Sequence, residues 1–297
     1  MTAQILKWNH HHLELGEKTR IMGVVNITPD SFSDGGHFLS ADAAVSQAER
    51  MVAEGADIID IGGESSRPFS EPVSTEQECS RVLPVIEQLA ERIQVPISID
   101  TTKAEVAEKA VSAGASVIND ISALRFDPRL GRVIAETGTL GILMHMKGMP
   151  ADMQVDPVYD DLLGEVVSFL RKAVGRAESF GVEKSRLIID PGIGFGKTVD
   201  HNLQLLKNLH CLEQIGTTIL VGTSRKKFIR RLLCSPDFGE LSPLHPLIET
   251  GTQASVAAAA LGGAHIVRVH DVANTAATLA IVDAIKHAGP REQGLQS

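Results

Sequence analysis

A carboxylate followed by a glycine-rich loop ends one of the most apolar runs in this chain. The run Leu187–Ile189 stops at Asp190, and a loop with three glycines leads to Lys197. A buried carboxylate is costly unless hydrogen-bond donors meet it, so a ligand that donates hydrogen bonds would suit this position. The loop is neither a P-loop nor a dinucleotide fingerprint, because Pro191 and Lys197 stand where those motifs need glycine. An ordinary turn built from glycines is the alternative interpretation.

Other apolar runs also stop at a polar residue that can bind or react. The residues at or just after these ends are Asn26, Glu64, Arg67, Asp100, Asn119, His145, Asp190, Lys226, Arg268 and His270. One polar strand end is ordinary, because the loop after a strand is exposed to water. A mixture of carboxylates, amides and cations at nearly every end indicates one shared site.

These polar ends form an acceptor set and a donor set. The acceptors Asp100, Asn119 and Asp190 suit a flat heterocycle with amino and ring N–H groups along one edge. The donating and cationic residues are Arg67, Ser224, Arg225, Lys226, Arg268 and His270. Because such cations bind phosphate oxygens, we expect a nitrogen heterocycle that carries a phosphate or diphosphate. Asn26 would hold Mg²⁺ on that diphosphate, since Mg²⁺ takes few protein ligands and keeps several waters.

Structural roles are open for several of these residues. Asp100 and Asp120 each precede an expected helix, where a carboxylate commonly caps the first turn. His145 lies between two methionines, and a hydrogen-bonded core role is favoured over a catalytic one. Asp60 lies between two isoleucines, and we expect it to face the surrounding helices.

Strand and helix signals alternate along the chain after an N-terminal segment. The expected strands begin near Ile21, Asp57, Val95, Ser116, Leu140, Arg186, Thr218 and His265. Helix signals follow them: a capping box at Thr75-x-x-Glu78, a helix opened by Thr101 or Thr102, a helix over residues 202–212 and an alanine-rich helix from Ala254. Eight such units predict a (β/α)8 TIM barrel in one domain over residues 1–297. Residues 1–20 form a peripheral hairpin whose Trp8 packs against the core; an open doubly wound sheet is the alternative fold.

Composition restricts the functional classes. The chain has 297 residues, 43% of them apolar and only 4% aromatic, with a net charge of −9. The negative charge argues against nucleic-acid and anionic-membrane binding, although a local basic pocket stays compatible with it. The three cysteines have no paired spacing and fit the cytoplasm. No apolar run reaches the ~18 residues of a membrane span, and no signal-peptide pattern is present.

The motifs, taken together, resemble those of dihydropteroate synthase from about Ile21 to His287. The matching stretches are GVVNITPDSFSDGG, DIIDIGGESSRP, ISIDTTKAEV, VINDISAL, LMHMKG, LIIDPGIGFGKT, LVGTSRKKFI and AHIVRVHDV. Their order and spacing agree with the family as well as their letters do. The resemblance implies a (β/α)8 barrel, active as a homodimer in folate biosynthesis. It would condense (7,8-dihydropterin-6-yl)methyl diphosphate with 4-aminobenzoate, using Mg²⁺, and release 7,8-dihydropteroate and diphosphate.

The resemblance also implies roles for individual residues. Asn26 matches the metal-associated asparagine of the family. The pterin contacts would be Asp100, Asn119, Asp190 and Lys226, and the diphosphate contacts Arg268 and His270. Phe195 belongs to the loop motif of the pterin site, and Met144 and Val269 would also bind substrate. Ser66 and Arg67 would lie in a loop that closes over aminobenzoate and diphosphate. Phe32 and Pro68 would flank the aminobenzoate position. Arg67, Asp100, Lys226, Arg268 and His270 would contribute to catalysis.

Two departures from the family and two rival functions accompany this interpretation. Ser66 stands where the family commonly has threonine, which keeps the hydroxyl but removes a methyl group beside aminobenzoate. Lys227 replaces a common serine, and the segment Pro236–Pro246 is longer than usual. A corrinoid-dependent methyltransferase domain would not need the Ser66–Pro68 loop or the Ser224–Lys226 turn. A non-catalytic pterin-binding homologue would be indicated by loss of the cationic residues, which are all present.

Overall fold

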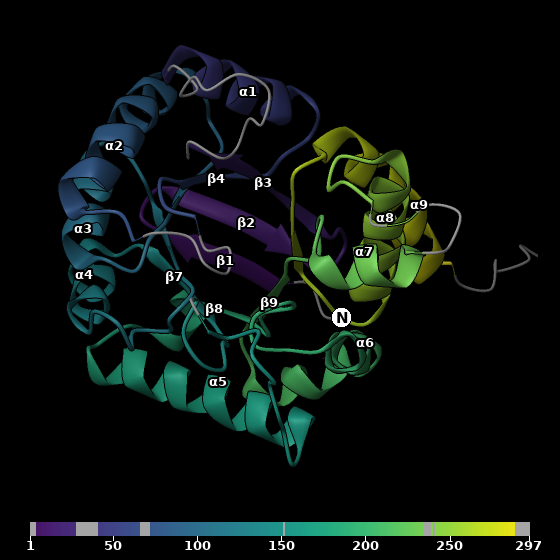
Figure 1. The fold of residues 1–297 in the computed structure, drawn as a ribbon. Helices are drawn as coiled ribbons and strands as arrows, with labels where there is room; N and C mark the ends of the chain where they lie inside the picture. The colour runs from purple at the N-terminus through teal and green to yellow at the C-terminus, as the bar shows by residue number, and fades with distance from the viewer. Residues whose placement is uncertain are drawn as a thin grey trace, which may run out of the picture.

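Eight parallel strands close into one barrel in the computed structural model (Figure 1). The structure describes residues 4–27, 41–65, 72–150, 152–234, 239 and 241–288. The barrel strands are β3 (Arg20–Asn26), β4 (Ile58–Gly62), β5 (Ile97–Asp100), β6 (Val117–Asp120), β7 (Leu140–Met144), β8 (Leu187–Asp190), β9 (Thr218–Val221) and β10 (Ile266–Val269). Strand β10 pairs with β3, so the sheet has no free edge. The predicted (β/α)8 barrel is confirmed, and the open sheet is excluded.

Helices surround the barrel as an outer ring (Figure 1). They are α1 (Ala41–Ala53), α2 (Thr75–Arg92), α3 (Ala104–Ser112), α4 (Arg129–Thr137), α5 (Leu162–Ser179), α6 (Val199–Lys207), α7 (Lys227–Leu233), α8 (Pro246–Leu261) and α9 (Val272–Lys286). Short 3₁₀ helices cover Lys184–Arg186 and Leu209–Ile215. In the described part of the chain, every helix is too short or too polar to span a lipid bilayer.

Side-chain alternation on the strands builds two apolar layers. On β4, Ile59 and Ile61 pack outward into the large cluster between barrel and helices, while Ile58 packs into the smaller cluster inside the barrel. All three side chains are fully buried. Both faces of each strand are therefore covered, which explains the continuous aliphatic runs in the sequence.

The N-terminal hairpin closes the bottom of the barrel. Strands β1 (Gln4–Trp8) and β2 (His11–Leu15) are antiparallel. Leu6, Trp8, Leu13 and Leu15 are buried and belong to the same cluster as residues near the amino ends of the barrel strands. Trp8 therefore packs against the core as predicted. The opposite end of the barrel, where the strands finish, stays open for a site.

The start of α2 differs from the predicted capping box by one residue. Ser74, not Thr75, is the N-cap: its Oγ accepts from the Gln77 amide at 3.2 Å, and the Ser74 amide donates to Gln77 Oε1 at 3.3 Å. Glu78 does not act as the reciprocal cap because it is fully buried and bound to Lys103. The ion pair of Glu78 with Lys103 therefore prevents Glu78 from completing a capping box with Thr75.

Other helix starts also differ from the sequence prediction. The helix expected from Thr101 or Thr102 begins at Ala104, whose amide donates to Asp127 Oδ2 at 3.0 Å. The expected helix over residues 202–212 is α6 followed by the 3₁₀ helix. Helix α8 begins already at Pro246, which suits a first helical position because it needs no amide donor.

Candidate active site

A cavity opens where the barrel strands end. Its lining residues are Asp100, Asn119, Ile121, Met144, Asp190, Gly192, Ile193, Phe195, Gly222, Lys226 and Arg268. They come from the ends of strands β5 to β10 and the loops that follow them. Acceptors and cations that lie far apart in the chain therefore share one cavity, as the sequence predicted.

Asp190 is held in place by the backbone of its own loop. Its Oδ1 accepts from the Gly192 amide at 2.7 Å, and its carbonyl accepts from the His145 amide at 2.8 Å. Gly192 has φ of +65°, and a Cβ there would lie 1.9 Å from the His145 carbonyl oxygen. Only glycine fits that position. Burial raises the pKa of Asp190, against the Gly192 amide and the charges of Lys226 and Arg268.

Asp100 and Arg268 form an ion pair inside the cavity. Arg268 Nη2 lies 2.8 Å from Asp100 Oδ2. Burial raises the pKa of Asp100 to about 7; Arg268 opposes this rise, while Asp60 adds to it. The interpretation of Asp100 as a helix cap has no support, because its carboxylate is engaged by Arg268 and α3 begins four residues later. Asp120 does bind backbone, accepting from the amides of Ser122 and Leu124.

The prediction that Asp60 faces the surrounding helices is wrong. Its side chain faces the barrel interior, where Oδ2 accepts from Arg268 Nε at 2.7 Å and from Asn119 Nδ2 at 3.1 Å. The reason is that Ile59 and Ile61 take the outward positions of β4. Because both its neighbours are apolar, alternation gave no sign of which face was which.

Lys226 and Phe195 form one wall of the cavity. Lys226 Nζ lies 4.1 Å from the centroid of the Phe195 ring, a favourable cation–π distance. Burial and the charge of Arg268 lower the pKa of Lys226 to about 8, while Asp190 and Asp100 oppose the shift. Phe195 packs in a small apolar cluster with Met144, which gives the cavity a surface suited to a flat ring.

The sequence marks Lys197 only as the end of the glycine loop, whereas the structure gives it a definite role. Its buried Nζ lies 2.9 Å from each of three acceptors: His145 Nδ1, the Gly192 carbonyl and the Phe195 carbonyl. It therefore ties the loop after β8 to the end of β7. Burial lowers the pKa of Lys197 to about 7, opposed by Asp190. His145 is a buried, hydrogen-bonded histidine, as favoured from the sequence.

The remaining donors divide between the cavity rim and the helices. His270 Nδ1 lies 3.0 Å from Ser224 Oγ, which joins the loops after β9 and β10. Arg225 turns toward α8, where its Nε lies 3.8 Å from Glu249 Oε2. Val269 is fully buried in the outer apolar layer, so its side chain does not face the cavity.

Asn26 lies where a metal could sit beside Asp100. In the strand register, Asn26 pairs with Gly62 and Gly62 pairs with Asp100. A Cβ on Gly62 would lie 3.3 Å from Asn26 Oδ1 and 4.0 Å from Asp100 Oδ2, so the glycine leaves this space open. Among the residues described, no three His, Cys, Asp or Glu side chains are grouped for a metal ion. One amide oxygen fits Mg²⁺ that is held mainly by substrate phosphate and water.

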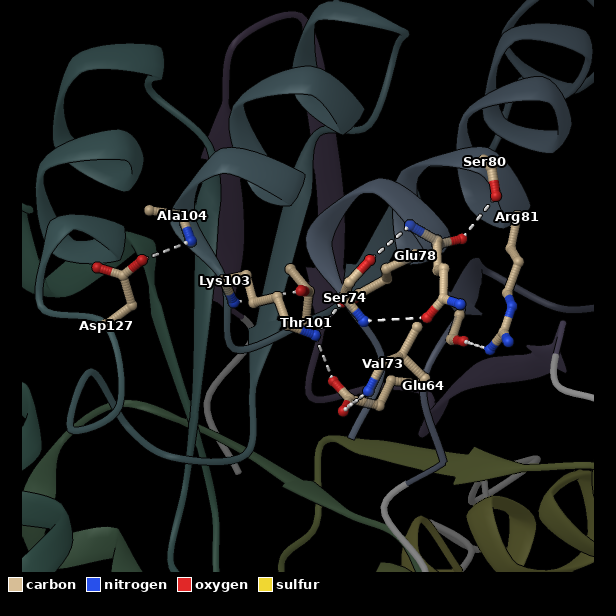
Figure 2. Close-up of polar contacts among 12 residues, drawn as sticks. Glu64, Val73, Ser74, Glu78, Ser80, Arg81, Thr101, Lys103, Ala104 and Asp127 are labelled. Atoms are coloured by element: carbon tan, nitrogen blue, oxygen red, sulfur yellow. Dashed lines mark hydrogen bonds and ion pairs between the residues drawn. The ribbon is translucent and has the colours of Figure 1, made fainter. Parts of the chain in front are cut away.

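Figure 2 shows the polar network that anchors both ends of the loop after β4. Glu64 Oε1 accepts from the Val73 amide at 3.0 Å, and its Oε2 lies 2.6 Å from Lys103 Nζ. Lys103 Nζ also lies 2.6 Å from Glu78 Oε2. Arg81 donates to the Gly63 carbonyl at 2.7 Å. The predicted site residues Phe32, Ser66, Arg67 and Pro68 lie outside the described residues.

Comparisons with known proteins agree with this geometry. The model of the pterin binding enzyme family matches residues 22–270. A dihydropteroate synthase of Synechocystis sp. is 46% identical over 270 residues, which is 91% of each chain. The chain belongs to the pterin-binding enzymes and, within them, to the dihydropteroate synthase family.

Solved structures extend the match to three dimensions. Dihydropteroate synthase of Xanthomonas albilineans with 4-aminobenzoic acid gives a TM-score of 0.87 at 42% identity, covering 97% of this chain and all of that one. The same enzyme in complex with 7,8-dihydropteroate gives a TM-score of 0.83 at 40% identity, covering 96% of this chain and all of the other. The predicted family and fold are confirmed.

Proposed function

We propose that this enzyme condenses (7,8-dihydropterin-6-yl)methyl diphosphate with 4-aminobenzoate, giving 7,8-dihydropteroate and diphosphate. The observation that carries the proposal is the single cavity that Asp100, Asn119, Asp190, Lys226 and Arg268 share. Carboxylate and amide oxygens would accept from the donor edge of the pterin ring. Lys226 would lie beside the ring, and Arg268 would face the diphosphate side. The ligand complexes of family members, with 4-aminobenzoic acid and with 7,8-dihydropteroate, support this choice of substrates.

The ring would bind between an apolar wall and a polar floor. Phe195 and Met144 supply flat or polarizable apolar surface beside Lys226. Asp190 is preorganised, because the Gly192 amide fixes one carboxylate oxygen and leaves the other available. Such a fixed acceptor spends little free energy on reordering when the ligand arrives.

Leaving-group stabilisation would carry most of the catalysis. In the proposed step the bond between the pterin methylene carbon and the diphosphate oxygen breaks, and its electron pair leaves with diphosphate. The 4-aminobenzoate nitrogen then bonds to the methylene carbon and releases a proton to water. Arg67, Arg268 and His270 would stabilise the charge that develops on diphosphate. Mg²⁺, when bound at Asn26, would neutralise part of that charge.

No general base is assigned to the amine. A methylene carbon that already carries cationic character reacts with a weak nucleophile, so positioning is the main requirement. Ser66, Phe32 and Pro68 would position 4-aminobenzoate. The serine at 66, in place of the threonine common in the family, would leave slightly more room beside that substrate.

Assembly and location follow from the same family membership. We propose a homodimer in the cytoplasm, with the whole chain forming one domain around the barrel. The net charge of −9 gives no support for a nucleic-acid or membrane partner.

Incubation with the pterin diphosphate and labelled 4-aminobenzoate tests the reaction. We expect labelled 7,8-dihydropteroate and one diphosphate per product, dependent on Mg²⁺. Binding of the pterin without product would instead indicate a non-catalytic pterin-binding protein. Methyl transfer from a reduced pterin to a corrinoid, with no condensation, would indicate the methyltransferase alternative.

A further inference from the structure

Asp60 is a buried carboxylate directly beneath the cavity, with no part in the reaction described above. Its side chain is fully buried, and it does not line the cavity. Burying a carboxylate is costly unless cations or hydrogen-bond donors compensate it. Within the described residues, its Oδ1 has no hydrogen-bond partner. In this part of the chain, the hydrogen bonds that compensate the buried charge of Asp60 are therefore all made to Oδ2.

Asp60 determines which way the Asn119 amide faces. Asn119 Nδ2 lies 3.1 Å from Asp60 Oδ2. With the amide reversed, two acceptor oxygens would meet in a buried position, which is strongly unfavourable. The carboxylate thus engages the amide nitrogen and turns the Asn119 oxygen away from itself. Because Asn119 lines the cavity and Asp60 does not, that oxygen is available to a ligand.

The same oxygen of Asp60 fixes the Arg268 guanidinium. Arg268 Nε lies 2.7 Å from Asp60 Oδ2, and Nη2 lies 2.8 Å from Asp100 Oδ2. Two carboxylates on neighbouring strands therefore hold the guanidinium at two separate nitrogens, which restricts both its position and its plane. Asp60 is the shared contact of two cavity residues.

We propose that Asp60 is the positioning residue for the pterin diphosphate part of the site. It orients the Asn119 amide, so that the cavity selects a ring edge that donates a hydrogen bond at Asn119, and it orients the Arg268 guanidinium on the diphosphate side. This inference rests on the proposed function for the identity of the ligand. Asp60 itself touches no substrate. Its loss should therefore weaken pterin binding and leave 4-aminobenzoate binding nearly unchanged.

Asp60→Asn removes the charge at nearly constant volume. We expect KM for the pterin diphosphate to rise about tenfold, the scale of one charge-assisted hydrogen bond, with KM for 4-aminobenzoate changed less than about twofold. Ser98→Ala is the matched control, because Ser98 pairs with Asp60 in the strand register and is equally buried. It should leave both KM values unchanged. Equal changes for both substrates, or none for the pterin, would overturn the proposal.

A second measurement uses the wild-type protein, in case Asp60→Asn does not fold. The side-chain NH₂ of Asn119, identified in NMR spectra by its loss in Asn119→Asp, should exchange with D₂O at least about tenfold more slowly than an exposed amide, because it is buried and bound to Asp60. Exchange at the exposed rate would overturn the proposed orientation. This readout needs no turnover, so it stays informative even if the condensation assay is negative.

Discussion

Removing the Lys103 ammonium should destabilise the fold more than removing a partner of an exposed ion pair does. Lys103 Nζ lies 2.6 Å from both Glu64 and Glu78, and its side chain is 25% exposed, whereas that of Glu78 is fully buried. Burial opposes a charged lysine here, but the bonds to the two carboxylates raise the pKa of Lys103 overall. Lys103 therefore stays protonated and neutralises a carboxylate that water does not reach.

The size of the effect follows from what Lys103→Met leaves behind. Glu78 Oε1 has no partner among the described residues, so the variant leaves a buried carboxylate without compensation. Breaking a buried pair in this way costs about 3–5 kcal/mol. Glu64 should suffer less, because it also accepts from the Val73 amide.

Urea unfolding followed by circular dichroism measures this cost. Lys109→Met is the control, since the Lys109–Glu105 pair is exposed and should contribute little. The double variant Lys103→Met/Glu78→Met should recover at least about half of the loss, because an apolar pair can replace a buried ion pair. A loss below about 1 kcal/mol in Lys103→Met, or no recovery in the double variant, would refute the reasoning.

Three further predictions concern the cavity. Arg268→Ala should lower kcat/KM at least about tenfold, through the loss of charge-assisted contacts; wild-type kinetics would remove Arg268 from the proposed leaving-group role. Gly192→Ala should weaken pterin binding in calorimetry, because its Cβ would lie 1.9 Å from a carbonyl oxygen, whereas Gly181→Ala, also at positive φ but with open space around it, should not; equal affinity in both would be contrary evidence. Burial, and then the charge of Lys197, lower the pKa of His145 to about 2 from 6.5. The folded state then binds fewer protons than the unfolded state below pH 6.5, so stability falls as pH falls. Between pH 7 and pH 5 the wild type should lose about 2 kcal/mol more than His145→Gln in urea unfolding, and identical losses would contradict the shift.

The barrel could be predicted because the sequence clearly marks where each strand ends. Each aliphatic run is short and stops at a polar residue, glycine or proline, so strand ends such as Asp100 and Asp190 were placed correctly. Strand ends of a parallel barrel meet at one mouth. Residues distant in sequence, such as Lys226 and Arg268, could therefore be assigned to one cavity from the sequence alone.

What the sequence could not predict depends on register and tertiary pairing. The sequence does not show which residues of β4 face the barrel interior. Both neighbours of Asp60 are apolar, so the alternation of polar and apolar residues that would distinguish the two faces is absent. Ser74 and Thr75 both begin a pattern that resembles a capping box, and only the buried pair of Glu78 with Lys103 decides between them. The role of Lys197 likewise depends on two strands lying side by side.

Calorimetric titration of the pterin diphosphate into wild type and Asp190→Asn tests the central claim most directly. The asparagine can still accept from the Gly192 amide through Oδ1, so the loop geometry is kept while the acceptor facing the ligand is lost. We expect saturable binding to the wild type and no detectable binding to the variant at the same concentrations. Unchanged affinity in Asp190→Asn would contradict the assignment of this cavity to the pterin ring.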